Sequence, residues 1–182
     1  MPPMIEAFFD RATNTVTYLV ADPATRRAAV IDPVLDYDPD TGEATTVSAD
    51  AVAEWAEARE LEIVWLLETH AHADHLSAGD YLRSRTGAPI GAGARIVETQ
   101  QTFAERFGLE TPPAEVFDRL FADGEGFALG ELEVEVLHTP GHTPACVSYR
   151  IGDAVFVGDT LFMPDFGTAR ADFPGGDAGT LY

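Results

Sequence analysis

Histidine and aspartate are concentrated in one short stretch of this chain. Three of the five histidines and one aspartate lie within six consecutive positions, in the order His70-Ala71-His72-Ala73-Asp74-His75. Neutral imidazole and carboxylate groups are the usual protein ligands of zinc and non-haem iron. The spacing therefore predicts a metal site. The alternative, a polar loop that is rich in histidine by chance, fits the density of donor groups poorly.

Two later positions carry the same kinds of donor. His142 follows the bend Pro140-Gly141 after a predicted strand at 132–137, and Asp159 follows Gly158 after a predicted strand at 154–157. The first cluster also follows an apolar run, at 63–67. Since α/β folds place their chemistry at the carboxyl ends of strands, the three groups are expected to converge. A turn-capping role is the alternative for Asp159.

Two further polar residues receive structural interpretations. His138 lies on the predicted strand itself, so we expect it to pack or to support a ligand. Cys146 lies at the start of a strand and is expected to be a small buried apolar residue. As the only cysteine, it excludes an internal disulfide and fits a reducing cytoplasm.

The elements around these residues predict an α/β fold. Strands at 15–20 and 28–31 form a hairpin, residues 36–47 form a polar surface loop, and Ser48 caps a helix that continues to about position 59. A buried strand follows at 61–68. The remaining expectations are a helix from Leu76 closed by Gly87, a strand at 88–91, a helix at 94–107 closed by Gly108, a connector at 109–126, strands at 127–129, 132–137, 146–151 and 154–157, and an irregular loop at 164–179.

Composition limits the class and the partners. The 182 residues suffice for one domain, predicted over 1–182, with a sizeable core. There are 31 acidic and 11 basic residues, for a net charge of −20, and every basic residue is arginine. Such a surface repels nucleic acid and anionic membranes, so neither is an expected partner. No apolar run has membrane-spanning length and no signal peptide is recognisable, which favours a cytoplasmic protein.

These motifs resemble the metallo-β-lactamase superfamily. The pattern H-x-H-x-D-H, with Gly141-His142 and Gly158-Asp159 behind it, is that of the family. The resemblance implies an αβ/βα sandwich, in which two mixed sheets are flanked by helices. Finer similarities, such as Asp32-Pro33-Val34 and the stretch from Gly167 to Phe173, point to bacterial persulfide dioxygenases, a branch related to glyoxalase II.

The resemblance implies a set of site residues. One Fe(II) per chain would be held by His70, His142 and Asp159, with no catalytic residue beyond the metal centre. His72, Asp74 and His75 would be supporting groups or the remains of a second metal site. Arg170 matches a family arginine that meets the carboxylate of glutathione persulfide, which the enzyme would oxidise with O₂ to sulfite and glutathione.

Two other functions remain open. A zinc hydrolase of the glyoxalase II type would use the same residues for two Zn(II) ions and cleave a thioester. A non-catalytic metal-binding remnant is the third reading, because the family continues beyond Tyr182 through a segment that carries a further histidine. A chain that stops there would lack one wall of the pocket. It would also expose a sheet edge that allows a homodimer.

Overall fold

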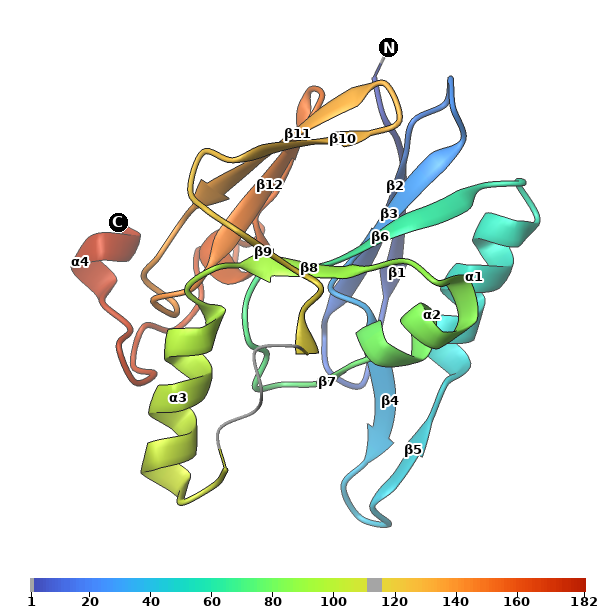
Figure 1. Cartoon of the computed structure of the whole chain (residues 1–182). Coiled ribbons are helices and arrows are strands. Elements are labelled where there is room, and N and C mark those ends of the chain that lie inside the picture. The colour runs from blue at the N-terminus through green and yellow to red at the C-terminus, as the bar shows by residue number, and fades with distance from the viewer. Residues whose placement is uncertain (1, 111–115) are drawn as a thin grey trace. The chain divides into compact units, whose positions relative to one another are not determined.

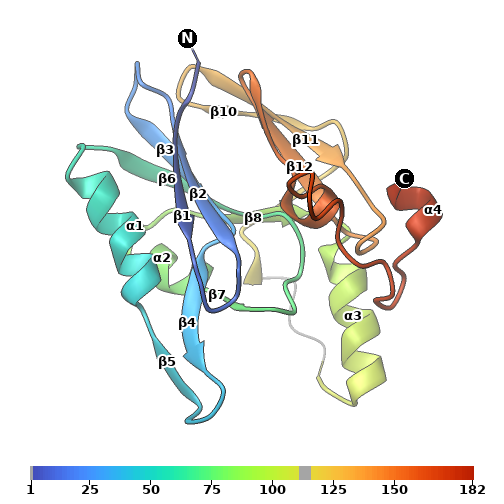
Figure 2. The same cartoon turned by 180° about the vertical axis from the view of Figure 1, so that it is seen from behind.

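The computed structural model describes residues 2–110 and 116–182, which group into two compact units. The first unit comprises Met1–Glu68, His72–Ile90 and Ala128–Glu133, and the second comprises Thr69–Ala71, Gly91–Phe127 and Val134–Tyr182. Figures 1 and 2 show the elements of each unit from two sides.

The first unit is built on strands in the order β1-β2-β3-β6. β1 (Met4–Phe9), β2 (Val16–Ala21) and β3 (Arg27–Ile31) are antiparallel neighbours, which confirms the predicted hairpin, and β6 (Glu62–Glu68) runs parallel to β3. Helices α1 (Val47–Glu57) and α2 (Gly79–Thr86) lie beside these strands (Figures 1 and 2). Residues 28–31 of β3 are fully buried, so this strand forms the centre of the unit's core.

A three-stranded sheet in the same unit corrects the prediction of a surface loop. β4 (Val34–Asp38) pairs with β5 (Glu43–Thr45) and with the two-residue β7 (Leu76–Ser77). The polar composition of 36–47 concealed a hairpin because β5 and the last two residues of β4 are exposed and carry no apolar alternation. Asp36 fixes its base by accepting hydrogen bonds from the backbone and the hydroxyl of Ser48.

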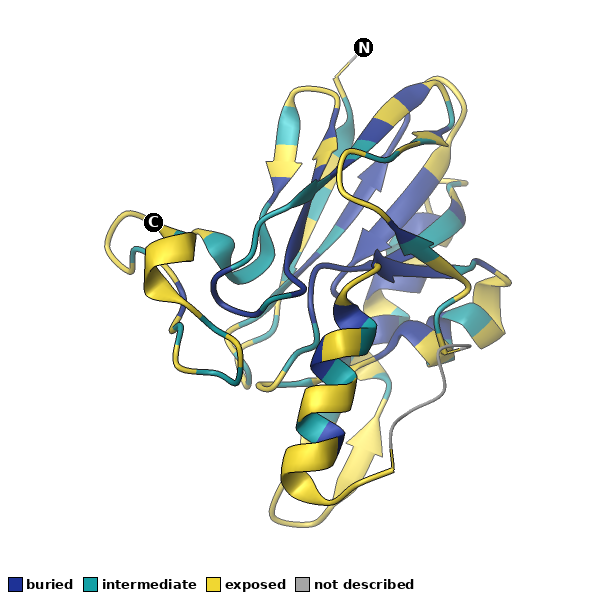
Figure 3. Cartoon of the chain, turned by 60° about the vertical axis from the view of Figure 1, so that its left-hand side comes forward, coloured by how far each residue is buried: buried dark blue, intermediate teal, exposed yellow. Residues whose placement is uncertain are grey.

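The second unit contains a parallel strand pair and most of an antiparallel sheet. β8 (Ile90–Gly93) pairs with β9 (Arg119–Phe121), and α3 (Ile96–Phe107) follows β8 along the chain. The antiparallel sheet has the order β10 (Gly126–Leu129), β11 (Leu132–His138), β12 (Val147–Ile151) and β13 (Ala154–Phe156). The short helices η2 (Gly158–Thr160) and α4 (Ala178–Leu181) complete the unit. Figure 3 shows that α3 exposes much of its surface.

Several predicted boundaries are confirmed and others need correction. Gly87 and Gly108 end their helices with φ values of 77° and 64°, as predicted. Ser48 does not cap α1, because the helix already begins at Val47 and Ser48 is bound to Asp36. Leu76 lies in β7, and the helix begins only at Gly79. The predicted connector contains β9, while its residues 111–115 lie outside the described part of the chain.

No helix in the described ranges 2–110 and 116–182 combines the length and the apolar character needed to cross a bilayer. The prediction of a single domain over the whole chain stays a prediction.

Within the first unit, Asp22 holds the turn between β10 and β11, whose residues 128–133 belong to this unit. Its buried carboxylate accepts hydrogen bonds from the backbone of Glu131 at 2.7 Å and from the hydroxyl of Thr25 at 2.7 Å. These two donors hold the pKa of Asp22 below its ordinary value of 3.8.

We therefore expect Asp22→Asn to lower the melting temperature in a pH-dependent way. A carboxylate whose pKa is depressed on folding stabilises above its unfolded pKa, and this contribution disappears as the pH falls through the folded value. The melting-temperature difference between wild type and variant should be largest near pH 7 and should shrink below pH 4. A difference that stays constant from pH 7 to pH 3 would contradict this role.

Candidate metal centre

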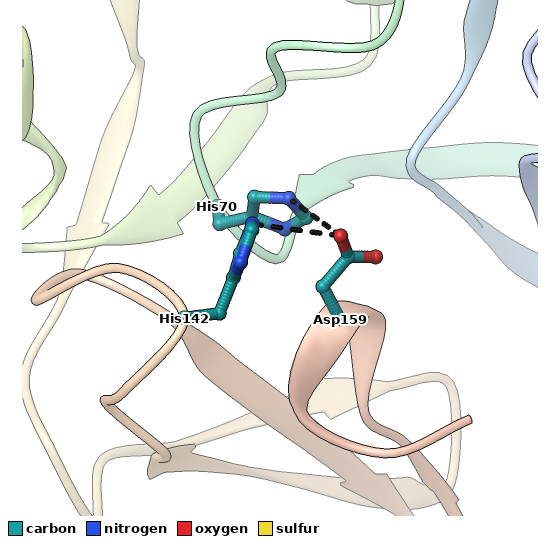
Figure 4. A group of neighbouring side chains, drawn as sticks. All are labelled: His70, His142 and Asp159. Carbon is teal, nitrogen blue, oxygen red and sulfur yellow. Dashed lines mark ion pairs between the residues drawn. The ribbon is translucent and has the colours of Figure 1, made fainter. Parts of the chain in front are cut away.

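Three side chains of the second unit converge as the sequence predicted. His70, His142 and Asp159 present one ligand atom each, and these atoms lie within 4.8 Å of one another. Asp159 Oδ2 is 3.5 Å from His142 Nε2 and 3.9 Å from His70 Nε2, and Figure 4 shows both imidazoles directed at this carboxylate. Both histidine side chains are almost completely buried, whereas that of Asp159 is about one-third exposed.

His70 is held through the residues on either side of it. The carbonyl of Thr69 accepts a hydrogen bond from the backbone of Val147 at 2.9 Å, and Ala71 packs against a buried cluster that includes Ala92 and Ala145. The Thr69 hydroxyl pairs with His70 Nδ1 at 2.9 Å. When Nδ1 donates in this pair, the lone pair of a neutral His70 lies on Nε2, the nitrogen that faces Asp159.

His142 is oriented by the segment that follows η2. Its Nδ1 lies 2.7 Å from the backbone carbonyl of Arg170, which can only accept, so Nδ1 carries the proton and Nε2 carries the lone pair. The Phe173 ring packs against the imidazole in a T-shaped arrangement, with the two ring centroids 5.1 Å apart. Gly141, with φ at 138°, provides the bend that precedes His142.

Asp159 lies in the single turn of η2, which passes very close to Thr69. Gly158 has φ at 50°, and a side-chain carbon added there would lie 2.4 Å from the Thr69 hydroxyl oxygen. No residue with a Cβ fits this position without movement. Glycine therefore allows the turn that carries Asp159 to approach the residue next to His70.

The donor set of this group fits a divalent metal. Two imidazole nitrogens with defined lone pairs and one carboxylate oxygen form the two-histidine, one-carboxylate arrangement of non-haem iron sites. A backbone carbonyl and a hydroxyl fix the opposite ring nitrogens, as the outer partners of metal-bound histidines usually do. The assignment of these three residues as ligands stays a prediction.

The first unit holds the other half of the histidine motif, beginning with His72. Its Nε2 lies 3.1 Å from both Asp32 Oδ1 and Glu68 Oε2, and all three side chains are more than nine-tenths buried. Burial lowers the pKa of His72, but the two carboxylates outweigh burial and raise that pKa well above 6.5. Ionised carboxylates only accept hydrogen bonds, so Nε2 carries a proton in this pair, and a neutral His72 would bind a metal through Nδ1.

Asp74 and His75 form a second pair in the same unit. Asp74 Oδ2 lies 3.2 Å from His75 Nδ1 and accepts a hydrogen bond from the Thr15 hydroxyl at 2.8 Å. Burial raises the pKa of Asp74, but these bonds outweigh burial and hold it well below the ordinary range. His75 Nε2 is buried, and within the described residues it has no hydrogen-bond partner. Ligand atoms of His72, Asp74 and His75 lie within 4.8 Å of one another.

A cavity of about 720 Å³ adjoins this second group. Its wall includes His72, Asp74 and His75 together with residues of β4 and β5, such as Tyr37 and Glu43. Its lining contains five carboxylate residues and no arginine, so its charge is set by acidic groups.

The remaining predicted residues are placed as follows. Arg170 is 65% exposed and forms a double ion pair with Asp172, at 2.6 Å from Nε and 2.9 Å from Nη2. His138 Nε2 lies 2.8 Å from the carbonyl of Pro144, as expected for a supporting residue. Cys146 is buried, and its sulfur accepts a hydrogen bond from the backbone of Thr143, which confirms the structural interpretation.

Sequence reasoning missed several residues that hold these histidines. Glu68 is a charged residue at the end of an apolar run, and this contrast is a signal that could have drawn attention to it. Asp32 was named only as the end of a strand and as part of the motif Asp32-Pro33-Val34, without a role for its side chain. The structure gives it a φ of 50°, which is rare for a residue with a side chain. The Arg170 carbonyl left no signal, since backbone acceptors are the same in every residue.

Comparison with known proteins gives the same family from sequence and from structure. A family model described as "Metallo-beta-lactamase superfamily" matches residues 10–182. The crystal structure of ETHE1 from Myxococcus xanthus superposes with a TM-score of 0.76 at 32% identity, covering 98% of this chain and 66% of that one.

Curated relatives carry several names. A beta-lactamase hydrolase-like protein of Xylella fastidiosa is 48% identical over 99% of this chain and 42% of its own length. "Glyoxylase B2" of Dictyostelium discoideum is 48% identical over 98% of this chain and 63% of its own length. Human mitochondrial persulfide dioxygenase ETHE1 is 31% identical over 100% of this chain and 61% of its own length. The chain thus spans about two-fifths to two-thirds of the length of these relatives.

Gly158→Ala tests the close approach beneath Asp159. The added carbon would clash with Thr69, and alanine would have an unfavourable positive φ at this position. We therefore expect a loss of about 1–3 kcal/mol in unfolding free energy. We also expect weaker metal binding, because Thr69 directly precedes the predicted ligand His70 and Gly158 directly precedes the predicted ligand Asp159. Denaturant unfolding and metal titration measure the two effects.

Gly124→Ala is the matched control, since Gly124 also has positive φ (72°) but has open space around it. Equal metal affinity in both variants would argue against a positioning role for Gly158.

Proposed function

Because the chain belongs to the metallo-beta-lactamase superfamily, we propose that it binds one Fe(II) at His70, His142 and Asp159 and oxidises glutathione persulfide with O₂. The predicted fold is confirmed: the structure has the mixed α/β architecture of this family, with several sheets and flanking helices. The observation that carries the proposal is the convergence of these three ligand atoms within 4.8 Å.

The donor set is the one typical of non-haem iron enzymes, which supports iron at this group. A zinc ion held by two histidines and one carboxylate would form an open catalytic site, and that alternative belongs to the second candidate below. Two histidines and one carboxylate leave coordination positions open, which oxygen chemistry requires.

The proposed reaction converts glutathione persulfide, O₂ and water into glutathione, sulfite and two protons. The terminal sulfur is oxidised, O₂ is reduced, and the sulfur–sulfur bond breaks so that glutathione leaves as the thiol. Iron, when bound, would supply the redox and Lewis-acid chemistry. The chain's own part is to hold the two ring tautomers through Thr69 and the Arg170 carbonyl, and to keep both imidazoles away from bulk water.

Arg170 is the proposed contact for the glutathione carboxylate. A guanidinium has five N–H donors in a fixed plane, and Asp172 uses those of Nε and Nη2 on one edge. Further donors are therefore available for a second carboxylate. The persulfide dioxygenase name of the human relative supports this substrate, which comes to the present chain as a proposal.

A second candidate function rests on the group His72, Asp74 and His75. The buried Nε2 of His75 has no hydrogen-bond partner among the described residues, and it would be satisfied by a metal ion. Two Zn(II) ions, one in each group, would suit thioester hydrolysis by a metal-activated water. The name of the Dictyostelium relative supports this candidate. For either function we propose a cytoplasmic location and a small thiol-derived substrate.

Metal content and oxygen uptake test the proposal together. Protein purified with iron present should hold about one iron per chain and consume O₂ when glutathione persulfide is added, with sulfite as product. His142→Ala should lose most of the iron and lower the rate at least about 100-fold, because the metal would lose one of three protein ligands.

His138→Gln is the matched control: His138 is not one of the proposed ligands, and the glutamine amide can keep the side-chain hydrogen bond to the Pro144 carbonyl. This variant should keep its iron and its rate. Two zinc ions per chain with thioester hydrolysis would favour the second candidate. A metal-loaded protein without either activity would support the non-catalytic reading.

Arg170→Ala separates substrate binding from the metal centre. The backbone carbonyl that accepts from His142 remains in this variant, so iron content should not change. Loss of a charge-assisted bond to substrate should raise KM for glutathione persulfide about 10-fold, with kcat little affected. Steady-state oxygen uptake gives both constants. Asp172→Asn, which removes the competing carboxylate, should lower KM or leave it unchanged, whereas a drop in kcat for Arg170→Ala would point to a role near the metal.

A further inference from the structure

Three hydroxyl groups in the second unit form a chain that none of the roles above uses. The Thr160 hydroxyl donates to the Thr139 hydroxyl at 3.1 Å, and the Thr139 hydroxyl pairs with the Ser148 hydroxyl at 2.9 Å. Ser148 is 1% exposed, and Thr139 and Thr160 are partly buried. The chain joins the end of β11, the strand β12 and the turn η2.

Thr139 belongs to the segment that delivers His142. Its backbone N–H donates to the Cys146 carbonyl at 2.9 Å and closes the segment between β11 and β12. Inside this segment Gly141 N–H donates to the Thr143 carbonyl, and the Thr143 backbone and hydroxyl both contact the Cys146 sulfur. The segment is therefore well fixed, and a hydroxyl at its beginning is a firm anchor.

Thr160 directly follows Asp159 in the short turn η2. η2 has three residues, and the Thr160 N–H donates to the Val157 carbonyl at 3.0 Å. Short 3₁₀ turns have poor hydrogen-bond geometry and need outside support. The Thr160 hydroxyl provides it, since it also lies 3.4 Å from the Thr139 carbonyl.

We propose that the Thr139–Thr160 hydroxyl bridge positions Asp159 beside His142 and thereby sets the affinity of the metal centre. The inference rests on the proposed metal site. The bridge links the two segments outside the ligands themselves, so it holds the 3.5 Å separation of Asp159 Oδ2 and His142 Nε2 when no ion is bound. A preformed site binds metal more tightly, because the ion does not have to order its ligands.

Thr160→Val tests the bridge with nearly unchanged side-chain volume. The metal-free chain of 182 residues is titrated with Co(II), whose visible absorption reports both affinity and ligand geometry without any turnover. We expect the dissociation constant to rise about 10-fold, the lower end of the range for residues that support metal ligands. The absorption spectrum should broaden, and the melting temperature of the metal-free chain should stay close to that of wild type. Thr160→Ser, which keeps the hydroxyl, should restore both affinity and spectrum.

Thr139→Val removes the other end of the bridge and gives a second route if Thr160→Val folds poorly. When both residues act through one bond, the double variant should bind Co(II) no more weakly than the weaker single variant. Thr102→Val is the matched control: its hydroxyl donates to the Glu98 carbonyl on α3, and Co(II) affinity should be unchanged.

The outcomes separate the bridge from the metal site. Wild-type chain that binds no Co(II) would overturn the metal site itself. Wild-type binding with equal affinity in Thr160→Val would overturn only the bridge, as would strictly additive losses in the double variant. A Thr160→Ser variant as weak as Thr160→Val would show that shape rather than the hydroxyl matters, and would also contradict the proposal.

Discussion

A neutral imidazole has one nitrogen that carries a proton and one that can bind a metal, and the protein decides which is which. In this chain His142 gives its Nδ1 proton to a backbone carbonyl, and His72 gives its Nε2 proton to two carboxylates. His70 and His75 are likewise paired at Nδ1, with Thr69 and with Asp74. In His70 and His142 the other nitrogen, Nε2, lies close to Asp159 Oδ2, so the motif depends on these outer partners as much as on the histidines.

The motif divides its histidines between the two compact units. Thr69–Ala71 belong to the second unit, whereas β6 before them and His72 after them belong to the first. Three contacts within the second unit hold the segment Thr69–Ala71. The Val147 N–H donates to the Thr69 carbonyl, Gly158 lies close to the Thr69 side chain, and Ala71 packs against a buried apolar cluster. A three-residue segment with so many restraints can hold His70 beside ligands that come from residues more than 70 positions later in the chain.

The candidate metal ligands could be predicted from the sequence more completely than the residues that hold those ligands in position. Strand β6, the closing glycines Gly87 and Gly108 and the strands β10 to β13 follow from local patterns that physics imposes directly. The convergence of His70, His142 and Asp159 was expected because strand ends share an edge. The partners Glu68 and Asp32 could not be derived, since their contact with His72 depends on tertiary structure. The hairpin β4–β5 was missed for a different reason: β5 and the end of β4 are exposed, so their composition shows no pattern of burial.

Burying two carboxylates against one imidazole needs an explanation of its own. Removing ions from water costs several kcal/mol each, and even a fully charged His72 balances only one of the two acidic groups. Asp32 adds backbone strain through its positive φ, while Glu68 accepts a short hydrogen bond from the Ser77 hydroxyl. Apolar residues of similar volume would satisfy the core of the first unit at least as well. The arrangement is understandable if His72 must be held in one tautomer, with strong negative charge behind it, because such support raises the basicity of Nδ1. On this argument, burying Asp32 and Glu68 lowers the folding stability of the first unit and in return orients Nδ1 of His72.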